Sequence, residues 1–109
     1  MTKVTIYAKK DGSYTGFDVE GHSGYGVKGE DVVCAGISSL VINATNSILK
    51  LTDTKLETYS DEETGTIQVR VLENYGESAE LLIESMILGL QGISDNYGEE
   101  FITLNFKEV

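Results

Sequence analysis

The chain has 109 residues, of which 40% are hydrophobic and 24% are charged, as expected for one globular domain spanning residues 1–109. Its 18 acidic and 8 basic residues give a formal net charge of -10, which disfavours direct nucleic-acid binding because a phosphate-binding protein needs a basic face. The start of the chain lacks a basic, apolar leader, its single cysteine allows no internal disulfide, and no apolar run approaches the ~18 residues of a membrane span, so we expect a cytoplasmic protein without membrane association.

The first half of the chain predicts a hairpin and then a helix. Apolar and polar residues alternate over 4–8 and 14–20, and an Asp-Gly pair at 11–12 supplies the turn between them. Apolar residues then follow helical spacing over about 31–50. Between its two ends this helix carries no charge, whereas a solvent-facing side normally carries Glu or Lys. We therefore expect it to be covered by the sheet and by a second copy of the chain, as in a homodimer.

The second half repeats this layout without repeating the residues. A second hairpin is predicted over 56–71 around the acidic turn 61–65, followed by a helix over about 77–97 and a final strand over 102–106. The element order is therefore ββαββαβ. It predicts an α+β fold in which two helices pack on a largely antiparallel sheet.

One glycine-rich stretch, residues 21–39, contains both the only histidine, His22, and the only cysteine, Cys34. A thiol and an imidazole are the minimum pair for thiolate chemistry. Asp31 falls at the predicted N-cap and Cys34 in the first helical turn, where the helix dipole stabilises a thiolate by ~0.3–1 kcal/mol. That is less than one pKa unit, about 1.36 kcal/mol, so a second stabiliser is needed. We expect His22 to supply it once the loop closes.

Other groups in this stretch could support such chemistry. Ser38 lies four residues after Cys34 on the same helix face, where its hydroxyl could bond the sulfur, a substrate carbonyl or the carbonyl of Cys34. The backbone amides of Cys34 and Ala35, free at a helix start, are candidate donors to an oxyanion. Glycines accept unusual backbone conformations at little steric cost and could form a substrate-binding loop. They are Gly21, Gly24, Gly26 and Gly29.

Simpler interpretations exist for each of these features. A lone cysteine is usually a small buried hydrophobe, and His22 could be a loop residue without a role. The glycines could form a merely flexible connection or, less plausibly, a phosphate-binding loop that lacks the usual Gly-Lys-Ser/Thr ending. One histidine and one cysteine do not complete a tetrahedral metal site, so no metal or other cofactor is predicted.

The segments 21–24 (GHSG), 29–35 (GEDVVCA) and 37–38 (IS) together resemble the signature of the ribosomal-processing cysteine protease family, Prp. The resemblance implies a cytoplasmic, dimeric endopeptidase whose substrate is the N-terminal segment of a large-subunit ribosomal protein, number twenty-seven, from which it removes a short extension. It implies that His22 is the general base and Cys34 the nucleophile, with Asp31 and Ser38 in support. Gly26 departs from the family pattern, which more often has alanine there, and this affects loop stiffness more than chemistry.

Two competing hypotheses use the same residues differently. In a non-enzymatic, ribosome-associated dimeric binding module, the loop would hold a ligand and Cys34 would be structural. In a thiol redox sensor, Cys34 would be reactive but no peptide would be cleaved. An inert thiol would favour the first alternative, and a reactive thiol without proteolysis would favour the second.

Overall fold

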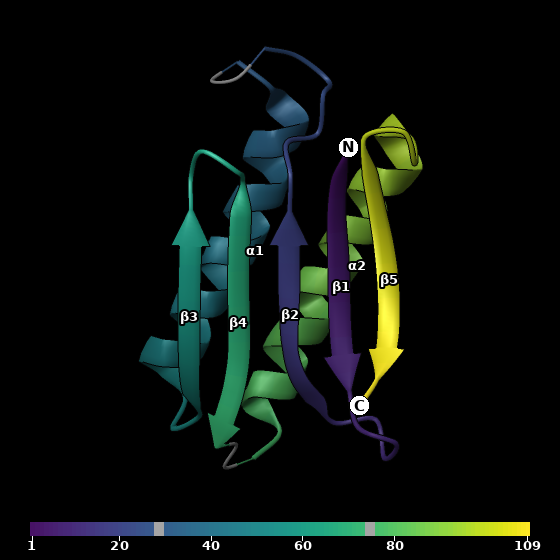
Figure 1. The fold of residues 1–109 in the computed structure, drawn as a ribbon. Helices are drawn as coiled ribbons and strands as arrows, with labels where there is room; N and C mark the ends of the chain where they lie inside the picture. The colour runs from purple at the N-terminus through teal and green to yellow at the C-terminus, as the bar shows by residue number, and fades with distance from the viewer. Residues whose placement is uncertain (28–29, 74–75) are drawn as a thin grey trace.

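The structure, a computed structural model, describes residues 1–27, 30–73 and 76–109 and has two layers, a five-stranded sheet and two helices that lie on one face of it (Figure 1). The predicted element order ββαββαβ and the α+β class are confirmed. In chain order the elements are β1 (Thr2–Ala8), β2 (Tyr14–Glu20), α1 (Val32–Leu51), β3 (Lys55–Asp61), β4 (Thr66–Glu73), α2 (Ser78–Tyr97) and β5 (Ile102–Glu108).

The strands lie in the order β3-β4-β2-β1-β5. The two hairpins, β1–β2 and β3–β4, are antiparallel, and β4 joins them by pairing antiparallel with β2. Among the strands that the structure describes, only β5 runs parallel to its neighbour, β1, so the sheet is mixed but largely antiparallel, as expected. This order places the end of β2, from which the glycine-rich loop (residues 21–30) departs, beside the turn that joins β3 to β4 (Figure 1).

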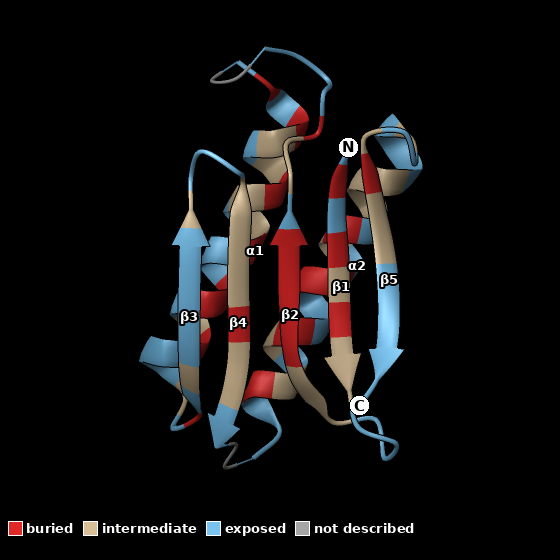
Figure 2. Ribbon diagram, viewed as in Figure 1, coloured by how far each residue is buried: buried red, intermediate tan, exposed pale blue. Residues whose placement is uncertain are grey.

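The core lies between the sheet and the helices (Figure 2). Alternate strand residues point into it because side chains on a strand alternate between its two faces. Phe17, Ile6 and Val69 are fully buried, as are Val41 and Leu90 from the helices. Central strands β2 and β1 carry most of the buried strand residues, while edge strand β3 is mostly exposed (Figure 2). The helices are thus fixed on the middle of the sheet, and α1 extends behind β4 and β3 (Figure 1).

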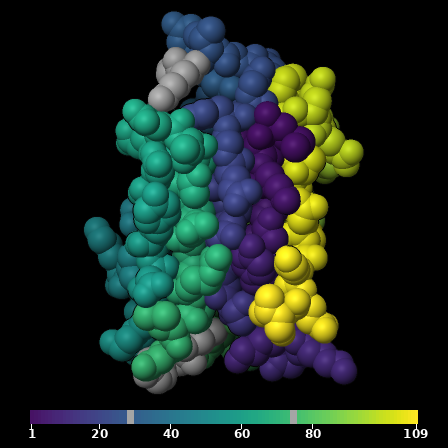
Figure 3. All heavy atoms as spheres, in the orientation of Figure 1, coloured from purple at the N-terminus to yellow at the C-terminus, as the bar shows by residue number. Residues whose placement is uncertain are grey.

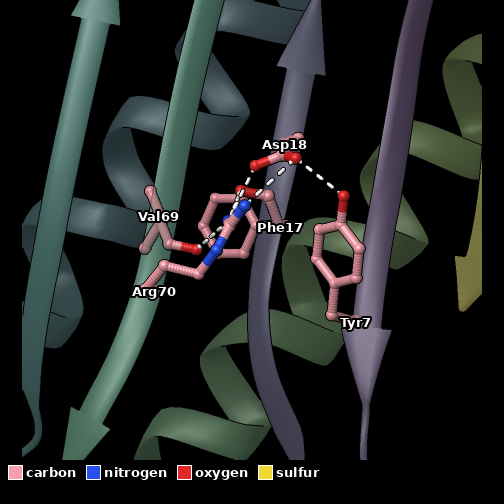
Figure 4. Close-up of polar contacts among 5 residues, drawn as sticks. All are labelled: Tyr7, Phe17, Asp18, Val69 and Arg70. Atoms are coloured by element: carbon pink, nitrogen blue, oxygen red, sulfur yellow. Dashed lines mark hydrogen bonds and ion pairs between the residues drawn. The ribbon is translucent and has the colours of Figure 1, made fainter. Parts of the chain in front are cut away.

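The opposite face of the sheet is open (Figure 3). Its centre holds a polar cluster from three strands, in which the Arg70 guanidinium bonds both oxygens of Asp18 (Nη1–Oδ1 2.7 Å, Nη2–Oδ2 3.2 Å) and the Tyr7 hydroxyl donates to Oδ2 at 2.7 Å (Figure 4). The Arg70 Cζ also lies 4.9 Å from the centre of the Tyr7 ring. Burial by itself raises the pKa of Asp18, but the bonds from Arg70 and Tyr7 outweigh it and hold that pKa below its ordinary value.

The sequence analysis found no apolar run long enough to span a membrane, but helix α1 passes that test. By length and composition alone it could cross a membrane, because Ser, Thr and Asn are its polar residues and Lys50 its one charge. Core helices of soluble proteins pass the same test, and six residues of α1 are buried in the fold. Several of its large apolar side chains are nevertheless exposed, namely Val32, Ile42, Leu49 and Leu51.

Candidate active site

Cys34 and His22 come together at one end of the sheet. Cys34 is the third residue of α1, and His22 lies two residues beyond the end of β2. The Sγ of Cys34 is 3.7 Å from Nδ1 of His22, within the range of a hydrogen bond to sulfur, and both side chains are half-buried. The predicted pairing of the thiol with the imidazole is therefore present in the geometry.

Asp31 links the glycine-rich loop to the helix. It is the N-cap of α1, and its Oδ1 accepts from the Cys34 amide at 2.9 Å, as the sequence predicts. Its Oδ2 accepts from the Ser23 hydroxyl at 2.5 Å and from the amides of Tyr25 and Gly26 at 3.1 and 3.2 Å. Burial alone raises the pKa of Asp31, but these hydrogen bonds, led by that from Ser23, outweigh it and lower the pKa below its ordinary value.

The described part of the loop is therefore held closed rather than forming a free arm. Besides the bonds to Asp31, the Tyr25 ring packs edge-on against Tyr97 and Phe101, with centroid distances of 5.3 and 5.1 Å. We expected a loop that closes to assemble the pair. The structure already places His22 against Cys34. The buried carboxylate of Asp31 accepts hydrogen bonds from Ser23 and Gly26, at the two ends of the loop segment 23–26, and so fixes the residues that follow His22.

The predicted loop glycines occupy different places. Gly24 and Gly26 line a hollow of about 360 Å³ beside Cys34. Gly21 directly follows β2 with a positive φ of 83°, and its carbonyl accepts from the Thr2 hydroxyl at 3.1 Å. It lines a second hollow, of about 470 Å³, together with His22 and Cys34. Gly29 lies outside the described residues.

The proposed oxyanion donors do not fit the expectation that they are free. The Cys34 amide donates to the Asp31 side chain, and the Ala35 amide donates to the Asp31 carbonyl at 3.0 Å. Both are thus engaged because Asp31 caps the helix with its carboxylate as well as its carbonyl. Within the described part of the chain, the Ser38 hydroxyl has no hydrogen-bond partner, so the back-bond to the Cys34 carbonyl is not formed.

A longer cleft runs from the pair between α1 and the β3–β4 hairpin. It has a volume of about 470 Å³ and contains His22, Cys34 and Ser38 at one end. Apolar side chains from α1 and the sheet line it, and polar side chains of β3 form its outer wall. This shape suits an extended peptide, since peptide sites are concave, largely apolar and carry a few polar groups.

Two features of the site escaped the sequence analysis. Ser23 is buried and bonds to Asp31, and its place inside the segment GHSG was the available signal. The second is the backbone carbonyl of Glu63, which lies 3.0 Å from Nε2 of His22. Glu63 is 41 residues away in the chain, and no local pattern indicates that contact.

Comparison with known proteins supplies the family. The family model described as cysteine protease Prp matches residues 1–102. The chain belongs to the Prp family of cysteine proteases. The ribosomal processing cysteine protease Prp of Staphylococcus aureus is 32% identical over 107 residues, which cover 98% of this chain and 100% of the relative.

Solved structures of the family have the same fold. The S. aureus ribosomal processing protease Prp in complex with a covalently linked product peptide matches with a TM-score of 0.92 at 32% identity, covering 98% of this chain and 100% of the other. The S. aureus protease with a substrate peptide matches with a TM-score of 0.86 at 31% identity and the same coverage. As a Prp family member this chain is a cysteine protease, and the prediction of an enzyme is confirmed.

Proposed function

We propose that this chain is a cytoplasmic endopeptidase that removes a short N-terminal extension from large-subunit ribosomal protein number twenty-seven, with Cys34 as nucleophile and His22 as general base. The observation that carries the proposal is the 3.7 Å contact between Sγ and Nδ1 at the head of a peptide-sized cleft. The relatives, which are ribosomal processing proteases, support the substrate class.

The reaction follows from the positions of the two side chains. His22 accepts the Cys34 proton at Nδ1, and the thiolate attacks the scissile carbonyl carbon to form a C–S bond and a tetrahedral oxyanion. The imidazolium gives its proton to the leaving amine as the C–N bond breaks, which leaves an acyl-enzyme. His22 then takes a proton from water as the hydroxide attacks the acyl carbon, the C–S bond breaks, and the imidazolium returns its proton to the Cys34 thiolate. The cleaved segment leaves with a new carboxyl group, which ionises in solvent.

Asp31 and Ser38 act in support on this proposal. The buried carboxylate of Asp31 holds the loop residues next to His22 against the start of α1. Ser38 lies one turn after Cys34, lines both hollows and has no hydrogen-bond partner among the described residues. Its hydroxyl can therefore donate to the substrate carbonyl as that oxygen gains charge. Gly24 and Gly26 line the hollow on the loop side and leave room for the peptide backbone.

Mass spectrometry of the ribosomal protein after incubation with the wild type and with Cys34→Ala tests the proposal. The wild type should shorten the protein at one bond near its N-terminus. The Cys34→Ala protein should fold, since Cys34 is only half-buried, and should leave the substrate intact. Cleavage by the variant would refute the mechanism, and a substrate left whole by the wild type would refute the choice of substrate. Cys34 alkylated readily by iodoacetamide without any cleavage would favour a redox sensor instead.

A further inference from the structure

The imidazole of His22 is contacted through both of its nitrogens. Nδ1 faces the Cys34 sulfur at 3.7 Å, and Nε2 lies 3.0 Å from the backbone carbonyl oxygen of Glu63 in the β3–β4 turn (residues 62–65). The two contacts come from elements far apart in the chain. They hold the ring between the helix that carries the thiol and the turn at the end of the β3–β4 hairpin.

The chemistry of the two partners decides where the proton sits. A carbonyl oxygen only accepts hydrogen bonds, so Nε2 must carry a hydrogen to bond with Glu63. In the neutral imidazole the other nitrogen, Nδ1, is then the acceptor, which is the state needed to receive the Cys34 proton. After that transfer both N–H groups keep an acceptor, the thiolate on one side and the carbonyl on the other. The Glu63 carbonyl therefore stabilises two states of His22: the neutral tautomer that accepts the proton, and the imidazolium that forms once the proton has been transferred.

The turn approaches this closely because residue 65 has no side chain. Gly65 has a φ of 66°, and a Cβ atom there would lie 2.8 Å from the Gly21 carbonyl oxygen and 3.2 Å from Cε1 of His22. A contact of 2.8 Å to a backbone atom forces one of the two segments to move. The turn itself is anchored, because the Glu63 amide donates to Oδ1 of Asp61 at 3.0 Å and Asp61 pairs with Thr66 across the hairpin.

We propose that the β3–β4 turn is a positioning element of the protease, in which the Glu63 carbonyl holds the proton on Nε2 of His22 and Gly65 allows the turn to dock against residues 21–22. The inference rests on the proposed function for the role of His22 as base. The contact itself can be tested without any proteolysis, because the chain has one histidine and one cysteine.

The test compares Gly65→Ala with Gly12→Ala. Gly12 also has a positive φ, 92°, in a hairpin turn, but a Cβ there meets nothing within 4 Å. Both variants therefore carry the same type of backbone strain, and only the first has the clash. Three measurements apply to each: iodoacetamide alkylation of Cys34 against pH, the exchange-protected imidazole N–H proton in NMR spectra, and kcat and KM on the substrate peptide.

For Gly65→Ala we expect the protected N–H signal to disappear and alkylation at neutral pH to slow by at least about tenfold, because a charge-assisted hydrogen bond is lost. We also expect kcat to fall about 100-fold while KM changes by less than about twofold, as a misplaced catalytic group predicts. Gly12→Ala should match the wild type in all three measurements. Intact signals and an unchanged alkylation profile in a folded Gly65→Ala would overturn the proposal.

Two further outcomes separate this proposal from the proposed function. If the wild type cleaves no peptide but Gly65→Ala still abolishes the N–H signal and slows alkylation, the turn positions His22 and the proposed function is wrong. If Gly65→Ala does not fold, the pair Gly65→Asn and Gly12→Asn replaces it, since asparagine tolerates a positive φ better than alanine. A protected imidazole proton that persists in Gly65→Asn would then overturn the proposal.

Discussion

At the scale of single residues, Ser38 lines the hollows on both sides of the Cys34–His22 pair. The amides of Cys34 and Ala35 are already bonded to Asp31, so the first helical turn offers no free backbone donor at those two positions. Ser38 lines both hollows around the pair and, among the described residues, has no partner of its own. We therefore propose that the Ser38 hydroxyl takes the role that the sequence analysis assigned to those backbone donors.

We expect Ser38→Ala to lower kcat by about 100-fold or more with little change in KM, because the lost hydrogen bond is strongest when the carbonyl oxygen carries charge. Steady-state kinetics on the substrate peptide measures both constants. Ser39→Ala is the matched control, since Ser39 is the next residue of α1 and is exposed. A Ser38→Ala enzyme as fast as the control would show that the hydroxyl does not assist the reaction.

Several residues of the site were predictable because their signals are local. An Asp three residues before Cys34 at the start of a helical pattern predicts the cap, and the cap is present. The pairing of His22 with Cys34 follows from their being the only residues of their kinds in one short stretch. The bond from Ser23 to Asp31 and the carbonyl of Glu63 depend on how the loop folds back and on sheet pairing, which no local pattern encodes.

At the scale of elements, the Tyr7–Asp18–Arg70 cluster joins β1, β2 and β4 across the open face of the sheet (Figure 4). Asp18 is 6% exposed although it points away from the helices. Its carboxylate is satisfied by the guanidinium and the tyrosine hydroxyl, which together cover it. The cluster thus ties the two hairpins together on the side that has no hydrophobic core.

This cluster predicts a particular loss of stability in acid. Because the pKa of Asp18 in the fold is below its ordinary value of ~3.9, its contribution is fully present well above pH 4 and is lost as pH falls through the lower native pKa. Asp18→Asn should lower the free energy of unfolding at pH 7 by about 1–3 kcal/mol and flatten its decline below pH 4. Urea unfolding between pH 7 and pH 2 measures both effects.

The exposed Asp95 of α2 provides the comparison for that experiment. Asp95→Asn removes the same formal charge and should leave both the stability at pH 7 and the acid slope close to those of the wild type. Equal behaviour of the two variants would mean that the cluster does not stabilise the fold.

The elements themselves followed from periodicity, because hairpins and amphipathic helices are encoded within a dozen residues. The expected helix over 31–50 is observed at Val32–Leu51, with Asp31 as its cap. The strand order was not predictable, since the pairings β2–β4 and β1–β5 join segments about fifty and about a hundred residues apart. The β2–β4 pairing brings the β3–β4 turn to His22, which explains why that part of the site was missed.

At the scale of the whole molecule, the uncharged outer side of α1 favours a homodimer. Leu49 is 48% exposed, and α1 carries one charge in twenty residues. Such a side on a protein of net charge -10 is better placed against another apolar surface than against water. A second copy of the chain is the partner that the sequence analysis expects.

We expect sedimentation at micromolar concentration to give the mass of a dimer, and Leu49→Glu to shift it to that of a monomer, because a buried, unpaired charge opposes association. Leu88→Glu, which changes an exposed leucine of α2, should remain dimeric. A wild type of monomer mass would count against the dimer. If Leu49→Glu and Leu88→Glu had equal association constants, the outer side of α1 would not be the dimer interface.

The parallel pairing of β1 with β5 sets an order for folding. Thr2 pairs with Ile102, so the first strand gains its outer neighbour only after the last strand has been synthesised. Contacts of such sequence separation form slowly, because a long loop must close before they do. A nascent chain could form the hairpins and α1, and so bring His22 near Cys34, while one edge of β1 is still unpaired. Pulsed hydrogen exchange during refolding should therefore show β2 and β4 protected first and β5 last.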